Sequence, residues 1–103
     1  MEIFNVRITA RAFGDIWDIT RHIAYVLGNP QAASKTSSLI ISSAEALSIF
    51  PKRHRVRKQD SRGRKLRFFP IGSYVVVYHV NESKHTVEVL RITYSRRDMN
   101  NLI

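Results

Sequence analysis

The sequence predicts a single α+β domain, in which an antiparallel hairpin of two helices packs on one face of a small antiparallel β-sheet. Three observations predict this class. Two runs rich in β-branched residues, at 73–80 and 86–94, are separated by a polar segment of hairpin-loop length. Two segments with helical periodicity precede them, and a segment of alternating polarity opens the chain. The 103 residues suffice for one core but not for two, so the expected domain spans residues 1–103.

The chain opens with an alternating segment and a first helix. Residues 3–9 place apolar side chains at every second position, which predicts a strand added to the main sheet. Residues 10–27 repeat apolar or small side chains three and four positions apart, which predicts a helix with its charged residues on the wet face. The expected inner stripe is Phe13, Ile16, Trp17, Thr20, Ile23, Ala24 and Leu27, and the expected wet face holds Arg11, Asp15, Asp18 and Arg21.

A second helix follows a short turn. Gly28 suits the left-handed position that ends a helix, Asn29 can cap the next one, and Pro30 fits its first turn. This helix is expected to reach about residue 49, because Phe50 precedes a proline and is pushed out of the helical region. The two helices should cover one face of the sheet and leave the other face open. The inner stripe of the second helix is expected to be Ala33, Thr36, Ile40, Ser43, Leu47 and Phe50.

Positive charge is concentrated between the second helix and the strands. The formal net charge is +9, and residues 51–67 hold nine Lys and Arg side chains against one carboxylate, Asp60. With no periodicity and a glycine at position 63, the part up to residue 65 is expected to be a mobile loop. Uncompensated cations at this density repel one another unless a partner neutralises them. The expected partner is therefore a polyanion or an acidic protein surface.

Several function classes find no support in the residues. The absence of cysteine excludes thiolate catalysis and Cys-type zinc sites, and the four histidines stand apart from other ligands, so neither metal nor cofactor is expected. No apolar run approaches the roughly 20 residues of a membrane span and no secretory signal is visible, so the cytoplasm is the expected location. Tyr74, Tyr78 and His79 are expected to pack rather than catalyse. Any chemistry would be general acid–base catalysis at a phosphodiester.

Some motifs carry a resemblance to a known family. The most specific are Gly-Asn-Pro-x-Ala-Ala at 28–33, Val-Glu-Val-Leu-Arg-Ile at 87–92 and Arg-Arg-Asp at 96–98, with Gly-Ser-Tyr-Val-Val-Val-Tyr at 72–78 between them. In this order and spacing they resemble the RelE/ParE superfamily of bacterial type II toxins over nearly the whole chain. The resemblance implies the same helix-on-sheet fold. It also implies a cognate antitoxin that wraps the toxin and neutralises it.

The superfamily divides into ribosome-dependent mRNA endonucleases that resemble RelE and ParE-like proteins that poison DNA gyrase. The nuclease branch usually has an arginine just after the Gly-x-Tyr of the third strand, where this chain has Val75. It tends to have a tyrosine near the C-terminus, where residues 100–103 are Asn-Asn-Leu-Ile. Other nuclease members use a histidine at the position of Tyr94, and Arg96 matches the one remaining arginine. The resemblance is therefore closer to the ParE-like branch.

Three hypotheses for the site follow from the resemblance. A RelE-like nuclease acting on mRNA in the ribosome would use Arg67, Tyr94 and Arg96 for catalysis, with the lysines and arginines of the loop holding RNA. A non-toxic domain that binds nucleic acid or protein would share only the fold. The preferred hypothesis is a ParE-like protein without covalent chemistry, which meets gyrase or its DNA complex through Arg57, Lys58, Arg62, Arg64, Lys65, Arg67, Arg96 and Arg97.

Overall fold

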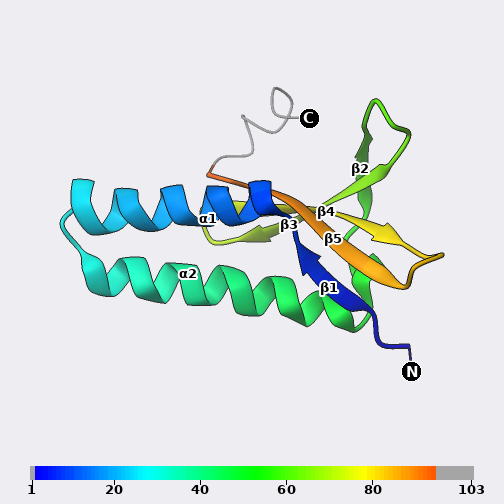
Figure 1. Cartoon of the computed structure of the whole chain (residues 1–103), viewed down its shortest axis with the longest axis horizontal. Coiled ribbons are helices and arrows are strands. Elements are labelled where there is room, and N and C mark those ends of the chain that lie inside the picture. Colours follow the sequence, from blue (N-terminus) through cyan, green and yellow to red (C-terminus); the bar gives the residue numbers. More distant parts are fainter. Residues whose placement is uncertain (1, 95–103) are drawn as a thin grey trace.

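The computed structural model describes residues 2–94 of the chain. In chain order the helices and strands are β1 (Asn5–Ile8), α1 (Ala10–Arg21), α2 (Pro30–Glu45), β2 (Val56–Gln59), β3 (Lys65–Ile71), β4 (Tyr74–Asn81) and β5 (Thr86–Thr93). A π-helical turn, η1 (His22–Val26), prolongs α1, and two 3-10 turns, η2 (Ala46–Ser48) and η3 (Pro51–Arg53), follow α2. Figure 1 shows α1 and α2 side by side, with β2 standing away from both. No helix in this part of the chain is long and apolar enough to cross a membrane.

The five strands form one sheet in the order β1-β5-β4-β3-β2. β3, β4 and β5 pair antiparallel, as the sequence predicts, and β2 adds to β3 in the antiparallel direction. β1 differs, because it pairs with β5 in the parallel direction, with Asn5 opposite Thr86 and Ile8 opposite Val89. Side chains alternate in the same way in both kinds of strand, so the sequence pattern does not reveal direction. The predicted fold class is confirmed, with a mixed sheet in place of a wholly antiparallel one.

The segment predicted to be a mobile loop, residues 51–65, contains a strand and the turn of a β-hairpin, so that prediction is wrong. β2 pairs with β3, and Val56 lies opposite Arg67. The backbone N–H of Asp60 donates to the carbonyl of Arg64 at 3.0 Å and closes the turn. Since β2 is an edge strand whose side chains are exposed or half-buried, it has no apolar face whose alternation would mark it as a strand.

The main core lies between the two helices and the sheet face that they cover. It receives one side of each helix, the alternate residues of β4 that point toward the helices, and Val87, Val89 and Ile92 of β5, where an irregularity in the pairing with β4 shifts the alternation after Val89. Helical periodicity and strand alternation therefore meet in a single apolar layer. Its buried members are Phe4, Ala12, Ile16, Ile40, Ala44, Leu47, Ile71, Val76, Tyr78, Val87, Val89 and Ile92.

The helical stripes predicted from periodicity are right only in part. Ile16 and Ile40 are buried as expected, whereas Phe13 and Trp17 are 52% and 61% exposed. The reason is that α1 packs through the small side chain of Ala12, which is fully buried, so its inner face runs along Ala12, Ile16 and Ile23 and is turned away from Phe13 and Trp17. Two further residues of the predicted inner stripes are exposed: Leu27 and Phe50.

The opposite face of the sheet carries a second, smaller apolar cluster. Leu66, Val75 and Val77 are buried there, and Phe68 and Leu90 pack against them. Within residues 2–94, no residue of α1 or α2 belongs to this cluster. The helices thus cover one face only, as predicted, but the face expected to be open has an apolar layer of its own.

Candidate functional site

The predicted cluster of cations lies on one ordered unit, which we call the basic hairpin and define as residues 51–67. It comprises η3, β2, the turn that follows β2 and the start of β3. Its half-buried cations are Lys58, Arg64 and Arg67, and its exposed cations are Lys52, Arg53, Arg55, Arg57, Arg62 and Lys65. The hairpin therefore brings together six of the residues predicted to bind the target: Arg57, Lys58, Arg62, Arg64, Lys65 and Arg67.

Two arginines fasten the base of the basic hairpin to the rest of the chain. Nη2 of Arg53 donates to the carbonyls of Ala46 and Ile49, at 2.6 and 3.0 Å. These carbonyls lie where α2 ends, and carbonyls at that end lack helical partners. Nη1 of Arg67 donates to the carbonyl of His54 at 2.8 Å. Part of the positive charge of the hairpin therefore holds backbone in place.

Asp60 organises the tip of the basic hairpin. Its Oδ1 accepts hydrogen bonds from the backbone N–H groups of Arg62 and Arg64, at 3.0 and 2.8 Å. Its Oδ2 accepts from Nε of Arg64 at 2.8 Å. Burial alone would raise the pKa of Asp60, but the hydrogen bonds and charge of Arg64 outweigh it and lower the pKa. The Asp60 carboxylate is thus ionised, and both of its oxygens accept hydrogen bonds from residues of the turn.

Beneath the base of the hairpin, Tyr78 and His54 have structural roles. The hydroxyl of Tyr78 is buried and donates to the carbonyl of Pro51 at 2.5 Å. Burial raises the pKa of Tyr78 to about 12. The His54 ring stacks on Phe69 with centroids 4.1 Å apart, and burial, aided by the charge of Arg53, lowers its pKa. Both rings pack as neutral groups, as the sequence predicts for Tyr78.

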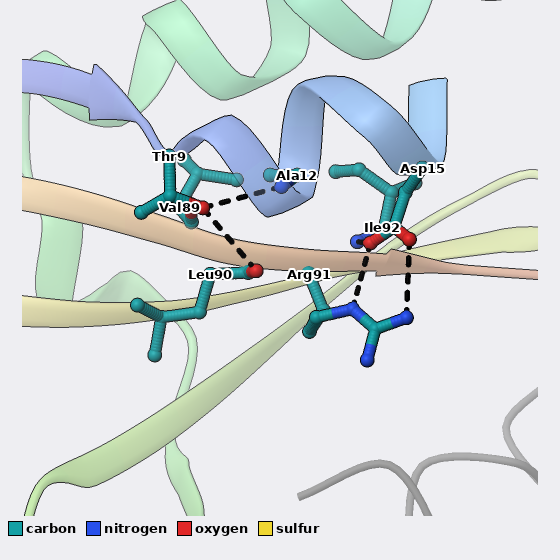
Figure 2. A network of polar contacts seen from close by, with 7 residues as sticks. All are labelled: Thr9, Ala12, Asp15, Val89, Leu90, Arg91 and Ile92. Carbon is teal, nitrogen blue, oxygen red and sulfur yellow. Dashed lines mark hydrogen bonds and ion pairs between the residues drawn. The ribbon is translucent and has the colours of Figure 1, made fainter. Parts of the chain in front are cut away.

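The start of α1 is fastened to the edge of β5, as Figure 2 shows. Because β1 ends at Ile8, no strand of residues 2–94 pairs with β5 on this edge beyond Val89. Thr9 takes the place of a strand partner there. Its Oγ1 accepts from the backbone N–H of Ala12 at 3.2 Å, which caps α1, and donates to the carbonyl of Val89 at 2.9 Å. The Thr9 side chain therefore caps α1 directly after β1 and also binds the backbone of β5.

Asp15 continues this edge one turn further along α1. Its carboxylate accepts from Nε and Nη2 of Arg91, at 2.8 and 3.0 Å, and from the backbone N–H of Ile92 at 2.9 Å. The two charged side chains are only 15% and 14% exposed. The hydrogen bonds from Arg91 to Asp15 raise the pKa of the guanidinium. The prediction that Asp15 lies on the wet face is therefore wrong, because β5 covers it. Asp15 and Arg91 are 76 positions apart, and no local pattern links them.

The residues predicted for a nuclease do not converge within the described part of the chain. Val75, at the position of the nuclease arginine, is 2% exposed in the small apolar cluster. Arg67 lies opposite Tyr78 in the sheet, whereas the Tyr94 ring contacts Tyr74, with centroids 5.4 Å apart. Tyr74 and Tyr78 are four residues apart in β4, which corresponds to about 13 Å. Within residues 2–94, no three His, Asp or Glu side chains are placed to hold a metal ion. Two predicted residues lie outside the described residues: Arg96 and Arg97.

Three solved structures that share this fold come from toxin–antitoxin systems. The chromosomal ParDE system from P. aeruginosa superposes with a TM-score of 0.73 at 19% identity, covering 91% of this chain and 98% of that one. The toxin–antitoxin complex RelBE2 from Mycobacterium tuberculosis gives 0.63 at 19% identity, covering 89% and 98%. The archaeal RelE–RelB complex from Pyrococcus horikoshii gives 0.63 at 16% identity, covering 92% and 98%. No curated protein sequence matches the chain.

Fold and sequence together define the class as a type II toxin of the RelE/ParE superfamily. The sequence model described as "ParE toxin of type II toxin-antitoxin system, parDE" matches residues 6–99, a span that includes both helices and nearly the whole sheet. The chain belongs to this ParE toxin family. The resemblance predicted from the sequence, including its preference for the ParE-like branch, is confirmed.

Proposed function

We propose that this toxin inhibits DNA gyrase in the cytoplasm and that a cognate antitoxin neutralises it. The observation that carries the choice of target is Val75. The nuclease branch usually has an arginine there, and cations at such a position would stabilise charge developing on a phosphate. Here the side chain is apolar, 2% exposed and packed against its neighbours on the sheet. A site of that kind supports binding to a target without cleavage.

Arg67 and Tyr94 support the same choice. Nη1 of Arg67 donates to backbone carbonyls at the base of the basic hairpin. The Tyr94 ring contacts Tyr74, at the end of β4 away from Arg67. A catalytic acid and base must both lie within hydrogen-bonding reach of one reacting group. We therefore assign the target-binding role to the exposed surface of the basic hairpin, where cations far outnumber carboxylates, and extend it to Arg96 and Arg97.

The helices offer a surface suited to the antitoxin. Phe13 and Trp17 lie one turn apart on the same face of α1 and are more than half exposed, as are Tyr25 in η1 and Leu39 in α2. Exposed apolar side chains that lie together are typical of a surface that a partner covers. The ParDE and RelBE structures that share the fold are themselves toxin–antitoxin systems. We propose that the antitoxin covers this apolar surface of α1, η1 and α2.

Supercoiling by purified gyrase tests the proposed target directly. We expect the toxin to block supercoiling of relaxed plasmid, and prior addition of the antitoxin to restore it. Unimpaired supercoiling at micromolar toxin would contradict the proposal. Expression without the antitoxin tests toxicity separately, because normal bacterial growth would instead favour a non-toxic binding domain.

A second candidate, a ribosome-dependent endoribonuclease, is favoured by one observation. The nine cations of the basic hairpin form a surface that also suits ribosomal RNA. Primer extension on a translated message distinguishes the two functions. A nuclease would produce cuts that disappear in the Arg96→Ala variant, whereas a gyrase inhibitor would produce none.

A further inference from the structure

A cavity of about 380 Å³ lies where the tip of the basic hairpin meets β5 and the start of α1. Four arginines from three separate parts of the chain line it, together with the carboxylate of Asp60: Arg11, Arg62, Arg64 and Arg91. Such a gathering of guanidinium groups is costly in the absence of an anion, because like charges repel in a partly enclosed space. The cavity was not foreseen from the sequence, since the tip of the hairpin was predicted to be mobile.

Arg91 supplies a donor that the fold does not use. Nε and Nη2 are paired with Asp15, whereas Nη1 is buried and has no hydrogen-bond partner in the part of the chain that the structure describes. Figure 2 shows this third nitrogen turned away from Asp15 and α1. A buried charged donor without a partner is destabilising. Arg91 is one of the residues that line the cavity, so this unpaired donor lies close to the place where an acceptor would bind.

Arg64 is held ready in a similar way. Its Nε binds Asp60, and the Asp60 carboxylate is already occupied by two backbone N–H groups. Asp15 and Asp60 thus orient two guanidinium groups, and two carboxylates do not neutralise four arginines. Groups that are fixed before binding lose little conformational freedom when a ligand arrives.

Arg11 and Arg62 complete the positive lining. Both are exposed, and neither forms an ion pair with a carboxylate of residues 2–94. Arg11 lies in the first turn of α1, which contains no acidic residue. A cation at the N-terminus of a helix is unfavourable, because that end of the helix dipole is positive. An anion bound beside Arg11 would relieve this repulsion.

We propose that this cavity binds a phosphodiester group of a nucleic acid backbone. Guanidinium groups match phosphate oxygens in geometry and charge, and four of them along one cavity suit successive phosphates of a polymer. The cavity continues into the basic hairpin, whose further exposed cations suit the neighbouring phosphates of a polymer rather than a free phosphate ion. The proposal goes beyond gyrase inhibition, because it concerns nucleic acid bound by the toxin alone.

Fluorescence anisotropy with labelled duplex DNA, and with RNA of the same sequence, tests the proposal on the full chain. The Arg11→Gln/Arg62→Gln variant removes two exposed lining cations that hold no part of the fold. Arg21→Gln/Lys35→Gln lowers the net charge equally on the exposed helix surface and serves as the matched control. We expect the cavity variant to bind about tenfold more weakly than wild type and to lower the salt slope by about two, while the control changes affinity at most about twofold. Thermal unfolding of the cavity variant should occur at a temperature no lower than that of the control, because removing Arg11 and Arg62 relieves repulsion.

An equal loss of nucleic acid affinity in the cavity variant and the control would overturn the proposal, because net charge alone would then explain the binding. Absence of nucleic acid binding at low salt would overturn it as well. Cavity-dependent binding to either DNA or RNA supports the phosphodiester site. Binding to RNA alone would support the site while opposing DNA as its ligand, and the gyrase assay without any variant tests the proposed target independently.

Discussion

Two regions of the molecule use charged side chains in opposite ways. Where α1 meets β5, Asp15 and Arg91 are largely buried, and the carboxylate accepts three hydrogen bonds that join the two elements. In the basic hairpin, six of the nine cations are exposed. Within residues 2–94, the ion pairs of the hairpin include Lys52 with Glu82 and Arg64 with Asp60. Removing one member of a buried pair costs far more than removing an exposed charge. The first region therefore serves the fold, and the second is available to a partner.

The largest expected effect is on the buried pair. Asp15→Ala leaves Arg91 without its partner and the N–H of Ile92 without an acceptor, so we expect the free energy of unfolding to fall by about 3–5 kcal/mol. Chemical denaturation measures this. Asp15→Asn keeps one acceptor oxygen and should lose less. A loss below about 1 kcal/mol for Asp15→Ala would contradict the role assigned to this pair.

Restoring the nuclease arginine at position 75 should unfold the protein more readily. Val75→Arg places a charge in the small apolar cluster, and we expect a loss of about 3 kcal/mol because that charge has no buried partner. Val75→Ala, which removes only packing, is the matched control and should lose about 1–2 kcal/mol. A stable Val75→Arg protein that cleaves translated mRNA would show that the position is ready for catalysis.

The hydroxyl of Tyr78 should contribute less than the buried ion pair. Tyr78→Phe removes the donor to the carbonyl of Pro51, and we expect a loss of about 1–2 kcal/mol in the free energy of unfolding. Tyr25→Phe, at a tyrosine that is 81% exposed, is the control and should change stability by less than about 0.5 kcal/mol. Equal losses of unfolding free energy for the two substitutions would contradict the structural role assigned to the Tyr78 hydroxyl.

The same tyrosine should give stability a dependence on alkaline pH. Its pKa is about 12 in the folded protein and 10.0 for the ordinary side chain, so the folded state holds the phenol proton more tightly than the unfolded state. The resulting stabilisation is complete below pH 10 and is lost as the pH rises toward 12. Unfolding measured across this range should show a steeper decline for wild type than for Tyr78→Phe. Identical slopes would contradict the raised pKa.

The smallest effect on stability is expected in the basic hairpin. Arg57→Gln/Arg62→Gln removes two exposed cations, one of which lies over the Phe68 ring at 5.9 Å, and should change the free energy of unfolding by at most about 0.5 kcal/mol. Denaturation beside Asp15→Ala measures the contrast between the two regions. A loss comparable to that of Asp15→Ala would mean that the hairpin cations hold the fold.

The sequence predicted the elements that have a periodic apolar face. Ile16 and Ile40 mark the helices, and the β-branched runs at 73–80 and 86–94 mark two strands. The apolar cluster of Val75 and Val77 on the face expected to be open was not predicted. The same reasoning placed the inner face of α1 wrongly. Hydrophobicity favours Trp17 over Ala12 as a buried residue, whereas in the structure the smaller side chain of Ala12 packs against the sheet and Trp17 is exposed. Periodicity locates an element but not the contact it makes.

Features that depend on distant residues were beyond the sequence. The pairing of Asp15 with Arg91 joins α1 to β5 across 76 positions, and no sequence pattern near either residue predicts it. The basic hairpin was missed because β2 lies at an edge and exposes its polar side chains, so its register with β3 leaves no alternation to read. The clustering of cations at 51–67 was predictable from the sequence alone, and their binding to a target stays a prediction. The cavity at the tip of the hairpin required the turn at Asp60.

The most direct test of the division between the two regions is gyrase supercoiling with one pair of variants of equal charge. If the exposed hairpin cations bind gyrase as proposed, Arg57→Gln/Arg62→Gln should inhibit gyrase at least about tenfold less well than wild type. It should unfold at the same denaturant concentration, because these side chains are exposed. Arg21→Gln/Lys35→Gln should inhibit like wild type. Full inhibition by the hairpin variant, or equal loss in both, would contradict the assignment of target binding to the basic hairpin.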